Sequence, residues 1–482
     1  MSTVSPNNST ADSHYDVIII GAGLSGLSSA VRLGMFGLKV LLLEKHYIVG
    51  GLNSFYAKGG RKFDVGLHAL TNFPSPSSGK SSPLLKLCRQ LRISLDSLAL
   101  QEQTSSRITF GRTDLRFTNN FEFFISEIER VFPHEQKRFH RLLSKMENFP
   151  AYSVDAEELS TRKILSEELN DPLLAEMLLC PTCYYGSARK NDIDFPTFIM
   201  LFDAIFKQGL ARPEQGIRAL LDPLTSKLKE LGVERKMNTP VQAIHTDTDK
   251  ITNIELENGK YVTATHYIST CGGLETENLL QPSPHAKSFE IGRFSIIESI
   301  SVFEGHPKSL GWDETVVFFN DSESFSYNEP KELVDLHSGV ICIPNNYGPP
   351  ILDMEKESKL RVTHPANYNL WSELDKETYL HKKKVWEERI LENGLQYLPT
   401  SREKLAQFKS KTRMTDTFTP RTIKKFTSHE NGALYGSPTK KRDGATPFKN
   451  LFLAGSDQGY VGIVGAMLGG IAVANNQILR NL

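Results

Sequence analysis

YDVIIIGAGLSGLSSAVRLGMFGLKVLLLE, residues 15–44, is the stretch that decides the fold. Residues 15–20 form a short, apolar, β-branched run, which is typical of a strand buried on both faces of a sheet. A glycine-rich turn follows at once. Residues 24–36 then have the apolar spacing of an amphipathic helix, and residues 39–43 are a second apolar run. The stretch therefore predicts a complete strand–helix–strand unit with parallel strands.

The turn between the first strand and the helix has the G-x-G-x-x-G pattern of a dinucleotide-binding loop. Gly21 permits the tight turn, Gly23 lets the backbone approach a pyrophosphate, and Gly26 lets the helix pack closely on the strand. The helix N-terminus offers unpaired N–H groups to the phosphates. Glu44 ends the second strand, where its carboxylate can bind an adenosine ribose and repel a 2′-phosphate. The unit predicts FAD or NAD and does not by itself distinguish them.

Two further glycine-rich segments favour FAD by resemblance. Gly50-Gly51 follows soon after the second strand, and NLFLAGSD stands at residues 450–457. Together they resemble the two FAD signatures of the flavin amine oxidase superfamily. The resemblance implies that the paired glycines lie along the pyrophosphate and ribityl chain, and that Asp457 binds in the same region. The helix that begins near Gly462 would direct its positive end at the flavin.

Within this superfamily the chain resembles the phytoene desaturase and retinol saturase branch. The matching segments are FDVGLH at 63–68, ENGALYG at 430–436 and GIVGAMLGG at 462–470. The strand around Val241 also resembles the family's adenine-side segment. The resemblance covers the FAD-binding pieces, whereas the stretches between them match only in general layout.

The chain departs from the amine oxidase pattern at two places. Leu52 stands where many amine oxidase relatives have arginine, which weakens the amine oxidase interpretation and leaves the prediction of FAD unchanged. No cysteine follows Cys342, so the C-terminal cysteinyl-flavin link of some amine oxidases is not expected. We therefore expect noncovalent FAD. The expected cofactor-binding residues are Gly21, Ala22, Gly23, Leu24, Ser25, Gly26, Glu44, Lys45, Gly50, Gly51, Leu52, Asn53, Val241, Gly455, Asp457, Gly462, Ile463 and Val464.

His68 and Tyr435 are the candidate catalytic residues. By resemblance, His68 lies near the substrate side of the flavin, where it could give or take the proton that accompanies hydride transfer. The alternative for His68 is a scaffold histidine bonded to backbone. Tyr435 lies where the family's chain approaches the flavin, with packing as its alternative. Asp64 is expected to brace the loop rather than to react.

The expected fold class is α/β, with a Rossmann-type, glutathione reductase-like FAD-binding domain and an inserted α+β substrate domain. The FAD-binding domain is assigned to residues 1–73, 212–275 and 415–482. The substrate domain is assigned to residues 74–211 and 276–414. The FAD-binding domain is thus discontinuous in sequence.

Several segments outside the FAD signatures have local patterns. Helical patterns run to about residue 211, and residues 237–269 turn to strands with Asn258-Gly259 as a hairpin turn. Residues 375–393 predict a charged surface helix. Residues 72–83 are rich in Ser, Pro and Gly, which predicts a loop that could act as a lid.

Composition and charge exclude several classes of protein. Lys plus Arg and Asp plus Glu both number 56, so no overall field recruits nucleic acid. The five scattered cysteines favour a reducing compartment. Cys180 and Cys183 have redox spacing, but they end a helical pattern and have no second pair for zinc, so structural cysteines and no metal site are expected. The first 14 residues lack the apolar core of a secretory signal.

Localisation and substrate are interpreted from two apolar stretches. Residues 460–478 are long enough for a membrane helix, but the cofactor motif before them predicts a helix buried in the nucleotide domain. Phe195–Phe206 is strongly aromatic, which indicates either core or the wall of a tunnel for a hydrophobic substrate. We expect a cytoplasmic protein, with peripheral membrane contact as an open alternative.

The predicted function is that of an FAD-dependent oxidoreductase acting on carbon–carbon bonds. The reaction would be desaturation, saturation or isomerisation of a hydrophobic, isoprenoid, carotenoid or retinoid-like substrate, and the electron acceptor or donor leaves no motif. Two alternatives stay open: an amine oxidase-type enzyme that releases peroxide, and a non-catalytic FAD-binding protein.

Overall fold

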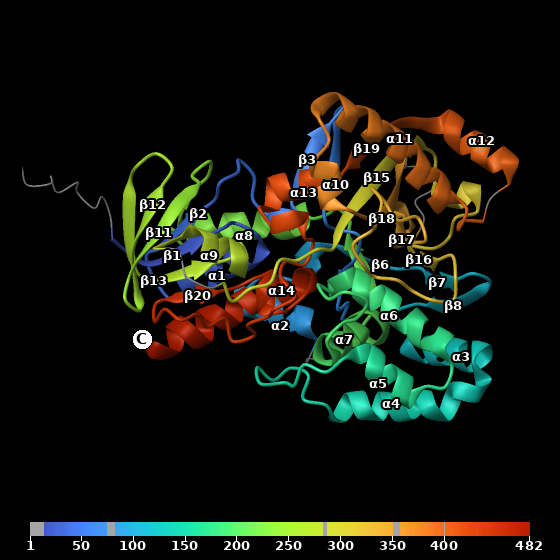
Figure 1. Ribbon diagram of the computed structural model, residues 1–482, viewed down its shortest axis with the longest axis horizontal. Helices are drawn as coiled ribbons and strands as arrows, with labels where there is room; N and C mark the ends of the chain where they lie inside the picture. Colours follow the sequence, from blue (N-terminus) through green and yellow to red (C-terminus); the bar gives the residue numbers. More distant parts are fainter. Residues whose placement is uncertain (1–13, 75–81, 283–286, 350–356, 400) are drawn as a thin grey trace, which may run out of the picture.

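Two large β-sheets, one at each end of the molecule, organise the fold (Figure 1). The computed structural model describes residues 14–74, 82–282, 287–349, 357–399 and 401–482. The expected N-terminal tail and most of the Ser/Pro/Gly-rich loop lie outside the described residues.

The first sheet contains the predicted strand–helix–strand unit. Strand β1 (His14–Ile20) pairs in parallel with β2 (Val40–Leu43), and helix α1 (Leu24–Gly34) connects them. All three elements are almost fully buried, as their apolar runs predict. The parallel order is β10 (Glu234–Lys236), β2, β1, β13 (Tyr261–Ser269) and β20 (Leu451–Leu453). The predicted Rossmann-type α/β fold is confirmed.

An antiparallel meander extends this sheet at the left of Figure 1. Strand β11 (Val241–Asp247) pairs with β12 (Lys250–Leu256), which pairs with the first residues of β13. Gly259 has φ +77° in the turn between β12 and β13, which confirms the predicted hairpin. The short strand β14 (Leu280–Gln281) adds to β11.

Helix α14 (Gly462–Val473) packs directly against α1. Ser25, Ser28 and Ser29 of α1 each donate a hydroxyl hydrogen bond of 2.9 Å to a carbonyl oxygen of α14. A Cβ on Gly470 would lie 2.3 Å from the carbonyl oxygen of Ser25, so only glycine permits this approach. The small residues of both helices are therefore explained by close helix packing.

Among the described residues, the segment Gly462–Asn481 is long and apolar enough to cross a membrane by length and composition. Half of its most apolar window is buried inside the protein. This burial agrees with the expectation of a helix packed within the nucleotide domain.

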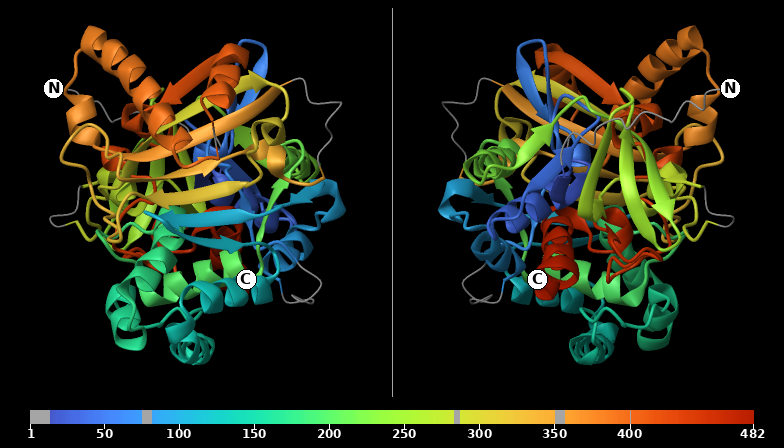
Figure 2. Two further views of the ribbon diagram at one scale, coloured as in Figure 1. Left: turned by 90° about the vertical axis from the view of Figure 1, so that its right-hand side faces the viewer. Right: turned by 90° about the vertical axis from the view of Figure 1, so that its left-hand side faces the viewer.

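The second sheet has seven strands and lies at the right of Figure 1; Figure 2 (left) shows it face on. Its order is β19 (Thr412–Phe418), β15 (Ser295–Glu304), β18 (Glu357–Ala366), β17 (Ser338–Cys342), β16 (Val316–Asn320), β7 (Ser106–Phe110) and β8 (Thr113–Phe117). The helical pattern expected before residue 211 misses β7 and β8. Strand β7 is stabilised by pairing with β16, about 200 residues away in sequence, which no local pattern reveals, and β8 pairs with β7.

Five helices lie below the second sheet in both figures. They are α3 (Phe121–Val131), α4 (Gln136–Asn148), α5 (Thr161–Glu168), α6 (Pro172–Gly186) and α7 (Phe195–Phe202). The rings of Phe124 and Phe206 stack with centroids 4.3 Å apart, inside a large aromatic core. The stretch Phe195–Phe206 thus belongs to the core, which is the first of the two interpretations given above, the other being the wall of a substrate tunnel.

Cys180 and Cys183 lie within α6 and are free and buried. Burial raises the pKa of both thiols well above the usual value, so neither is a ready thiolate. The interpretation of these residues as structural cysteines is supported.

The predicted charged surface helix is observed as α11 (Lys376–Leu395).

The remaining helices and strands belong to neither of the two large sheets. They are α2 (Pro83–Leu91), α8 (Arg218–Glu230), α9 (Gly273–Leu279), α10 (Tyr368–Ser372), α12 (Arg402–Lys411), α13 (Pro420–Thr427), β3 (Phe55–Lys58), β4 (Arg61–Asp64), β5 (Leu70–Thr71), β6 (Leu100–Glu102) and β9 (Leu210–Pro213). Strand β19 belongs to the second sheet, although the expected division assigns residues from 415 onward to the FAD-binding domain.

Candidate functional site

A cavity of about 780 Å³ is lined by residues of both sheets. This volume is within the range of small-molecule and cofactor sites. Of the predicted site residues, those that line it are Gly21, Gly23, Leu24, Ser25, Glu44, Lys45, Gly50, Gly51, Leu52, Asn53, His68, Val241, Tyr435, Gly455, Gly462 and Ile463. The fold thus brings together segments that are more than 400 residues apart, from the turn after β1 to the start of α14.

The glycines of the turn after β1 differ in what surrounds them. A Cβ on Gly21, whose φ is +100°, would lie 2.5 Å from Thr270 Oγ1, and one on Gly26 would lie 2.0 Å from the carbonyl oxygen of Gly21. A Cβ on Gly23 would meet no atom within 4 Å. Gly21 and Gly26 are therefore required by the fold, whereas the missing side chain of Gly23 leaves open the space that a pyrophosphate would need.

Glu44 holds the turn in place. Its carboxylate accepts hydrogen bonds from the backbone N–H of Ala22 at 2.8 Å and of His46 at 2.9 Å. Gly50 also donates its backbone N–H to the carbonyl oxygen of Ala22 at 2.8 Å. A carboxylate has about four acceptor positions, so Glu44 retains capacity for a ligand hydroxyl while it braces the loop.

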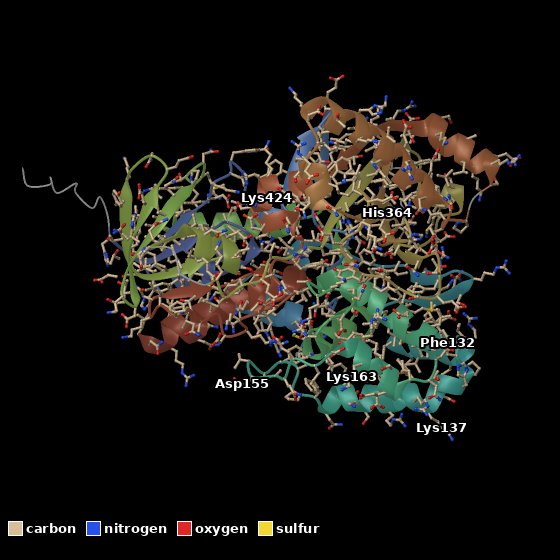
Figure 3. The ribbon with its side chains drawn as sticks, in the orientation of Figure 1. Phe132, Lys137, Asp155, Lys163, His364 and Lys424 are labelled. Carbon is tan, nitrogen blue, oxygen red and sulfur yellow. The ribbon has the colours of Figure 1, made fainter. Side chains whose placement is uncertain are left out.

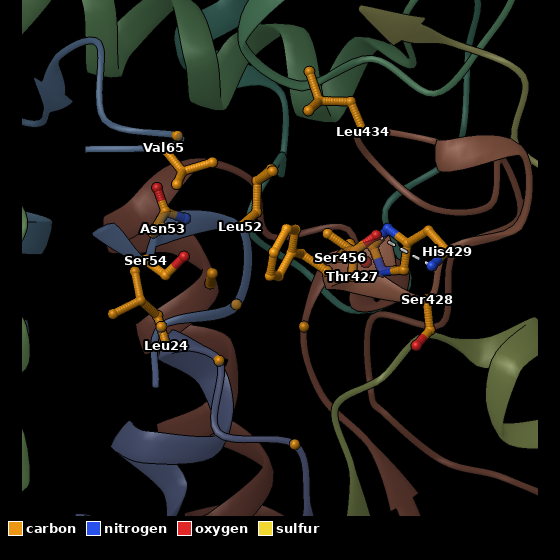
Figure 4. Close-up of a pocket in the computed structure, with 18 of the residues that line it drawn as sticks. Leu24, Leu52, Asn53, Ser54, Val65, Thr427, Ser428, His429, Leu434 and Ser456 are labelled. Atoms are coloured by element: carbon orange, nitrogen blue, oxygen red, sulfur yellow. Dashed lines mark hydrogen bonds between the residues drawn. The ribbon is translucent and has the colours of Figure 1, made fainter. Parts of the chain in front are cut away.

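A segment from α13 to residue 430 faces the turn across the cavity. In Figure 4, Thr427, Ser428 and His429 lie opposite Leu24 and the residues 52–54. The Lys45 ammonium donates to Ser428 Oγ, and His46 Nε2 lies 3.0 Å from the carbonyl oxygen of Phe426. This segment therefore closes one side of the cavity, and we call residues 424–430 the covering segment.

Lys424 lies at the junction of the two halves of the molecule (Figure 3). Its ammonium forms an ion pair of 2.6 Å with Glu430 Oε2, and both residues line the cavity. The backbone N–H of Glu430 donates to Glu275 Oε1 at 2.8 Å. Glu275 belongs to α9, which follows strand β13 of the first sheet, so this bond links the covering segment to that part of the molecule. These contacts join the covering segment to the nucleotide half.

His68 lies at the inner end of the cavity against a buried carboxylate. Its Nε2 is 3.2 Å from both carboxylate oxygens of Glu298, whose side chain is only 1% exposed. Burial would raise the pKa of Glu298, but the charge of Arg361 and the hydrogen bonds from His68 and Arg361 hold it at about 2. Burial lowers the pKa of His68, and it outweighs the attraction of Glu298.

These shifts define the protonation of the His68–Glu298 pair near neutral pH. Glu298 is ionised and paired with Arg361, and His68 is neutral. The hydrogen-bond geometry assigns the proton to Nε2, which donates to Glu298. The other ring nitrogen of His68, Nδ1, makes no hydrogen bond among the described residues. Because His68 lines the cavity, the lone pair of Nδ1 is available to a ligand.

Two arginines hold the loop that carries His68. Arg212 donates to Asp64 and, at 2.9 Å, to the carbonyl oxygen of His68, while Arg361 donates to the carbonyl oxygen of Leu67 at 2.9 Å. Asp64 also accepts the backbone N–H of Ile217 at 3.1 Å. Asp64 thus braces the loop, as expected, and His68 has little freedom to move.

The predicted residues Ala22, Gly26, Asp457 and Val464 do not line the cavity. Asp457 is 3% exposed, and its carboxylate accepts the backbone N–H groups of Gly273 and Ser437, both at 2.7 Å. The structure therefore gives this side chain a bracing position rather than the cofactor contact implied by resemblance, because nearby backbone donors satisfy it.

Tyr435 lines the cavity, but its hydroxyl already has a partner. It donates to the carbonyl oxygen of Tyr184 in α6. Burial raises the pKa of Tyr435 well above its usual value. This arrangement supports packing, the alternative interpretation of Tyr435, more than proton transfer.

Comparison with known proteins identifies the family. The family described as flavin containing amine oxidoreductase matches residues 24–379. The chain belongs to this family. Membership confirms the predicted superfamily, and the cofactor is FAD.

The names of two curated relatives of this chain refer to carotenoids. Prolycopene isomerase 2, chloroplastic, of an Oncidium hybrid cultivar is 31% identical over 134 residues, which cover 27% of this chain and 22% of that protein. The 4,4'-diaponeurosporene oxygenase of Staphylococcus aureus (strain USA300) is 24% identical over 288 residues, covering 55% of this chain and 57% of that protein. The matched part is thus less than two thirds of either relative.

Solved structures show the same fold over nearly the whole chain. An oxidoreductase from Methanosarcina mazei has a TM-score of 0.62 at 18% identity and covers 95% of this chain and 100% of its own. A triple mutant of putrescine oxidase has a TM-score of 0.63 at 17% identity, covering 97% and 99%. At these identities the likeness concerns the fold alone.

Sequence reasoning missed several residues of this flavoprotein's cavity. Glu298 comes from the second sheet, where Arg361 pairs with it, and the covering segment 424–430 overlaps the recognised motif only at its end. The one available signal was a glutamate inside the apolar run SIIESISVFE at 295–304, because a buried charge in a strand requires a partner.

Proposed function

We propose that this chain is an FAD-dependent oxidoreductase that acts on carbon–carbon bonds of a hydrophobic, isoprenoid, carotenoid or retinoid-like substrate. The observation that carries the proposal is the continuity of one cavity. It runs from the open glycine turn to the buried His68–Glu298 pair, with apolar side chains beside that pair. We also propose the two-domain division expected from the sequence, with the cavity between the domains.

The first half of the cavity fits FAD. The N-terminus of α1 and the open position at Gly23 suit the pyrophosphate, and Glu44 suits the adenosine ribose. Val241, which lines the cavity, is proposed to lie on the adenine side. Gly51 lies beside the turn, with φ +57°, which favours glycine, and a Cβ there would be 3.4 Å from Gly23 Cα. FAD, when bound, supplies the exchange of a hydride or electrons with the substrate.

The second half suits an apolar substrate. Val65, Ile296, Val340, Phe418 and Leu434 line this part of the cavity. Each CH₂ group transferred from water gains about 0.8 kcal/mol, so a chain of isoprene units could bind with few polar contacts. The names of the curated relatives, which refer to carotenoids, support the same class of substrate.

His68 is proposed to hold or move a proton. Glu298 keeps the Nε2 proton in place and orients the ring, which leaves the Nδ1 lone pair free to accept a proton from the substrate side. Arg361 neutralises Glu298, so the pair adds no net charge to an apolar pocket. Such a group suits the loss or gain of a proton next to a carbon–carbon bond.

The test is turnover of the flavin-loaded protein with carotenoids and isoprenoids in detergent micelles, followed by chromatography of the products. A change in the number or geometry of carbon–carbon double bonds supports the proposal. A panel of amines with detection of peroxide is run in parallel, because Tyr184, Tyr185 and Tyr435 line the inner end and aromatic rings can bind an ammonium group. Turnover of amines alone would contradict the proposal in favour of an amine oxidase, and reduction by light without any turnover would favour a non-catalytic flavoprotein.

A further inference from the structure

A row of side chains crosses the second sheet at the inner end of the cavity. In the strand register, Phe418 of β19 pairs with Glu298 of β15, Glu298 pairs with Thr363 of β18, and Thr363 pairs with Val340 of β17. Cross-strand partners point to the same face of a sheet, and all four residues line the cavity. The row therefore places two polar side chains between two apolar ones.

Two hydroxyl groups at this end have no partner. Thr363 Oγ1 and Tyr185 OH are buried and make no hydrogen bond within the part of the chain that the structure describes. Both residues line the cavity. Burying a polar group without a partner costs folding free energy, so a pair of such groups that line one cavity suggests a ligand that would satisfy them.

The neighbouring polar groups differ because they are already satisfied. Tyr184 OH is 2.8 Å from Ser338 Oγ, and Tyr435 OH donates to a backbone carbonyl. His68 adds the free Nδ1 lone pair described above. The inner end thus offers two hydroxyls and one acceptor nitrogen to a ligand.

The charge of this end restricts the ligand further. The carboxylate of Glu298 is compensated by the guanidinium of Arg361 within the same row of strands. Arg361 and Arg212 also lie within electrostatic range of Tyr185, where they oppose the effect of burial, which raises the pKa of this tyrosine. A site with balanced charges and neutral donors favours a neutral polar group over a carboxylate or an ammonium.

We propose that Thr363 and Tyr185 bind a neutral oxygen function, a hydroxyl or a carbonyl, at the end of the hydrophobic substrate. The inference rests on the proposed function and narrows its substrate class from hydrocarbons to oxygenated isoprenoids. A hydrocarbon would leave both hydroxyls unsatisfied, whereas the oxygen of an alcohol or a carbonyl can accept a hydrogen bond from Thr363 and another from Tyr185.

The test compares binding of matched ligands to the FAD-loaded protein. The ligands are the isoprenoid alcohols geraniol, farnesol and geranylgeraniol, each with the hydrocarbon in which hydrogen replaces the hydroxyl, all delivered in the same micelles. Binding is followed by the change in flavin absorption. We expect each alcohol to bind about tenfold or more tightly than its hydrocarbon.

Variants then attribute the preference to the two hydroxyls. Thr363→Val and Tyr185→Phe should each reduce the preference about tenfold while the melting temperature stays the same or rises, since each removes an unsatisfied buried hydroxyl. Thr363→Ser keeps a hydroxyl and should restore the preference. Tyr347→Phe is the matched control, because it removes a buried tyrosine hydroxyl that does not line the cavity.

The outcomes separate this inference from the proposed function. Equal binding of alcohol and hydrocarbon, or an unchanged preference in Thr363→Val and Tyr185→Phe, would overturn the inference while turnover of a hydrocarbon still supported the proposed function. If no isoprenoid of either kind perturbs the flavin or is converted, both are overturned.

Discussion

Replacing Gly23 by valine separates cofactor binding from folding. Gly23 has φ −66° and ψ 174°, which any residue can adopt, and a Cβ there meets no atom within 4 Å. The change should therefore alter the free energy of unfolding by no more than about 1 kcal/mol, the usual effect of a residue at a helix N-cap. The fold should persist.

The effect on FAD should be much larger. The valine side chain would occupy the space through which a pyrophosphate approaches the N–H groups of the turn. Hydrogen bonds to charged groups contribute about 1.5–3 kcal/mol each, so the loss of two weakens FAD by at least about 3 kcal/mol, or more than about 100-fold.

The assay measures flavin per chain in the purified protein and the affinity for added FAD, together with the melting temperature. Gly26→Val is the contrasting variant, because its Cβ would lie 2.0 Å from the carbonyl oxygen of Gly21 and should prevent folding. A Gly23→Val protein that folds and carries the wild-type amount of FAD would refute the placement of the pyrophosphate.

Three further predictions concern other residues. Glu44→Ala should weaken FAD by roughly 1–3 kcal/mol through lost charged hydrogen bonds, measured by flavin titration; unchanged affinity would argue against the ribose role. His68→Gln should keep FAD but slow turnover by roughly 10²–10⁴-fold, and equal turnover would make His68 a scaffold residue. Burial lowers the pKa of His364 to about 4, so the unfolded chain binds its proton first as pH falls. Urea unfolding should therefore show a loss of about 3 kcal/mol between pH 6.5 and 4, reduced in His364→Gln; an equal loss in that variant would exclude His364 as the cause.

The surroundings of His364 explain its low pKa. It lies within the second sheet (Figure 3), with Nδ1 2.9 Å from the carbonyl oxygen of Ser338 and no partner for Nε2 among the described residues. Protonation would place a charge in this dry environment, which is the desolvation cost that lowers its pKa.

The cofactor half of the cavity could be predicted because its signals are local. The turn at Gly21 and the acid at Glu44 lie within one strand–helix–strand unit, where apolar period and glycine spacing determine the geometry. The segment at Gly455 required resemblance, since its proximity to the turn depends on the pairing of β20 with β13.

In the inner half of the cavity only His68 and Tyr435 were predicted, by resemblance, because the other residues there meet through non-local pairing. His68 and Glu298 are 230 residues apart, and Glu298 and Thr363 face one another only through the register of β15 and β18. The glutamate in β15 indicates that a buried partner exists but not which residue it is, and the threonine in β18 gives no signal in sequence. Their chemistry follows from burial, which the sequence pattern alone does not give.

The central claim is that the turn after β1 and the segment before α14 bind one flavin nucleotide between them. The most direct measurement is the absorption spectrum of the purified protein, with the flavin released and counted per chain. We predict flavin absorption bands and one FAD for each folded chain, either as isolated or after addition of FAD. A correctly folded protein that is colourless and does not take up added FAD would contradict the claim.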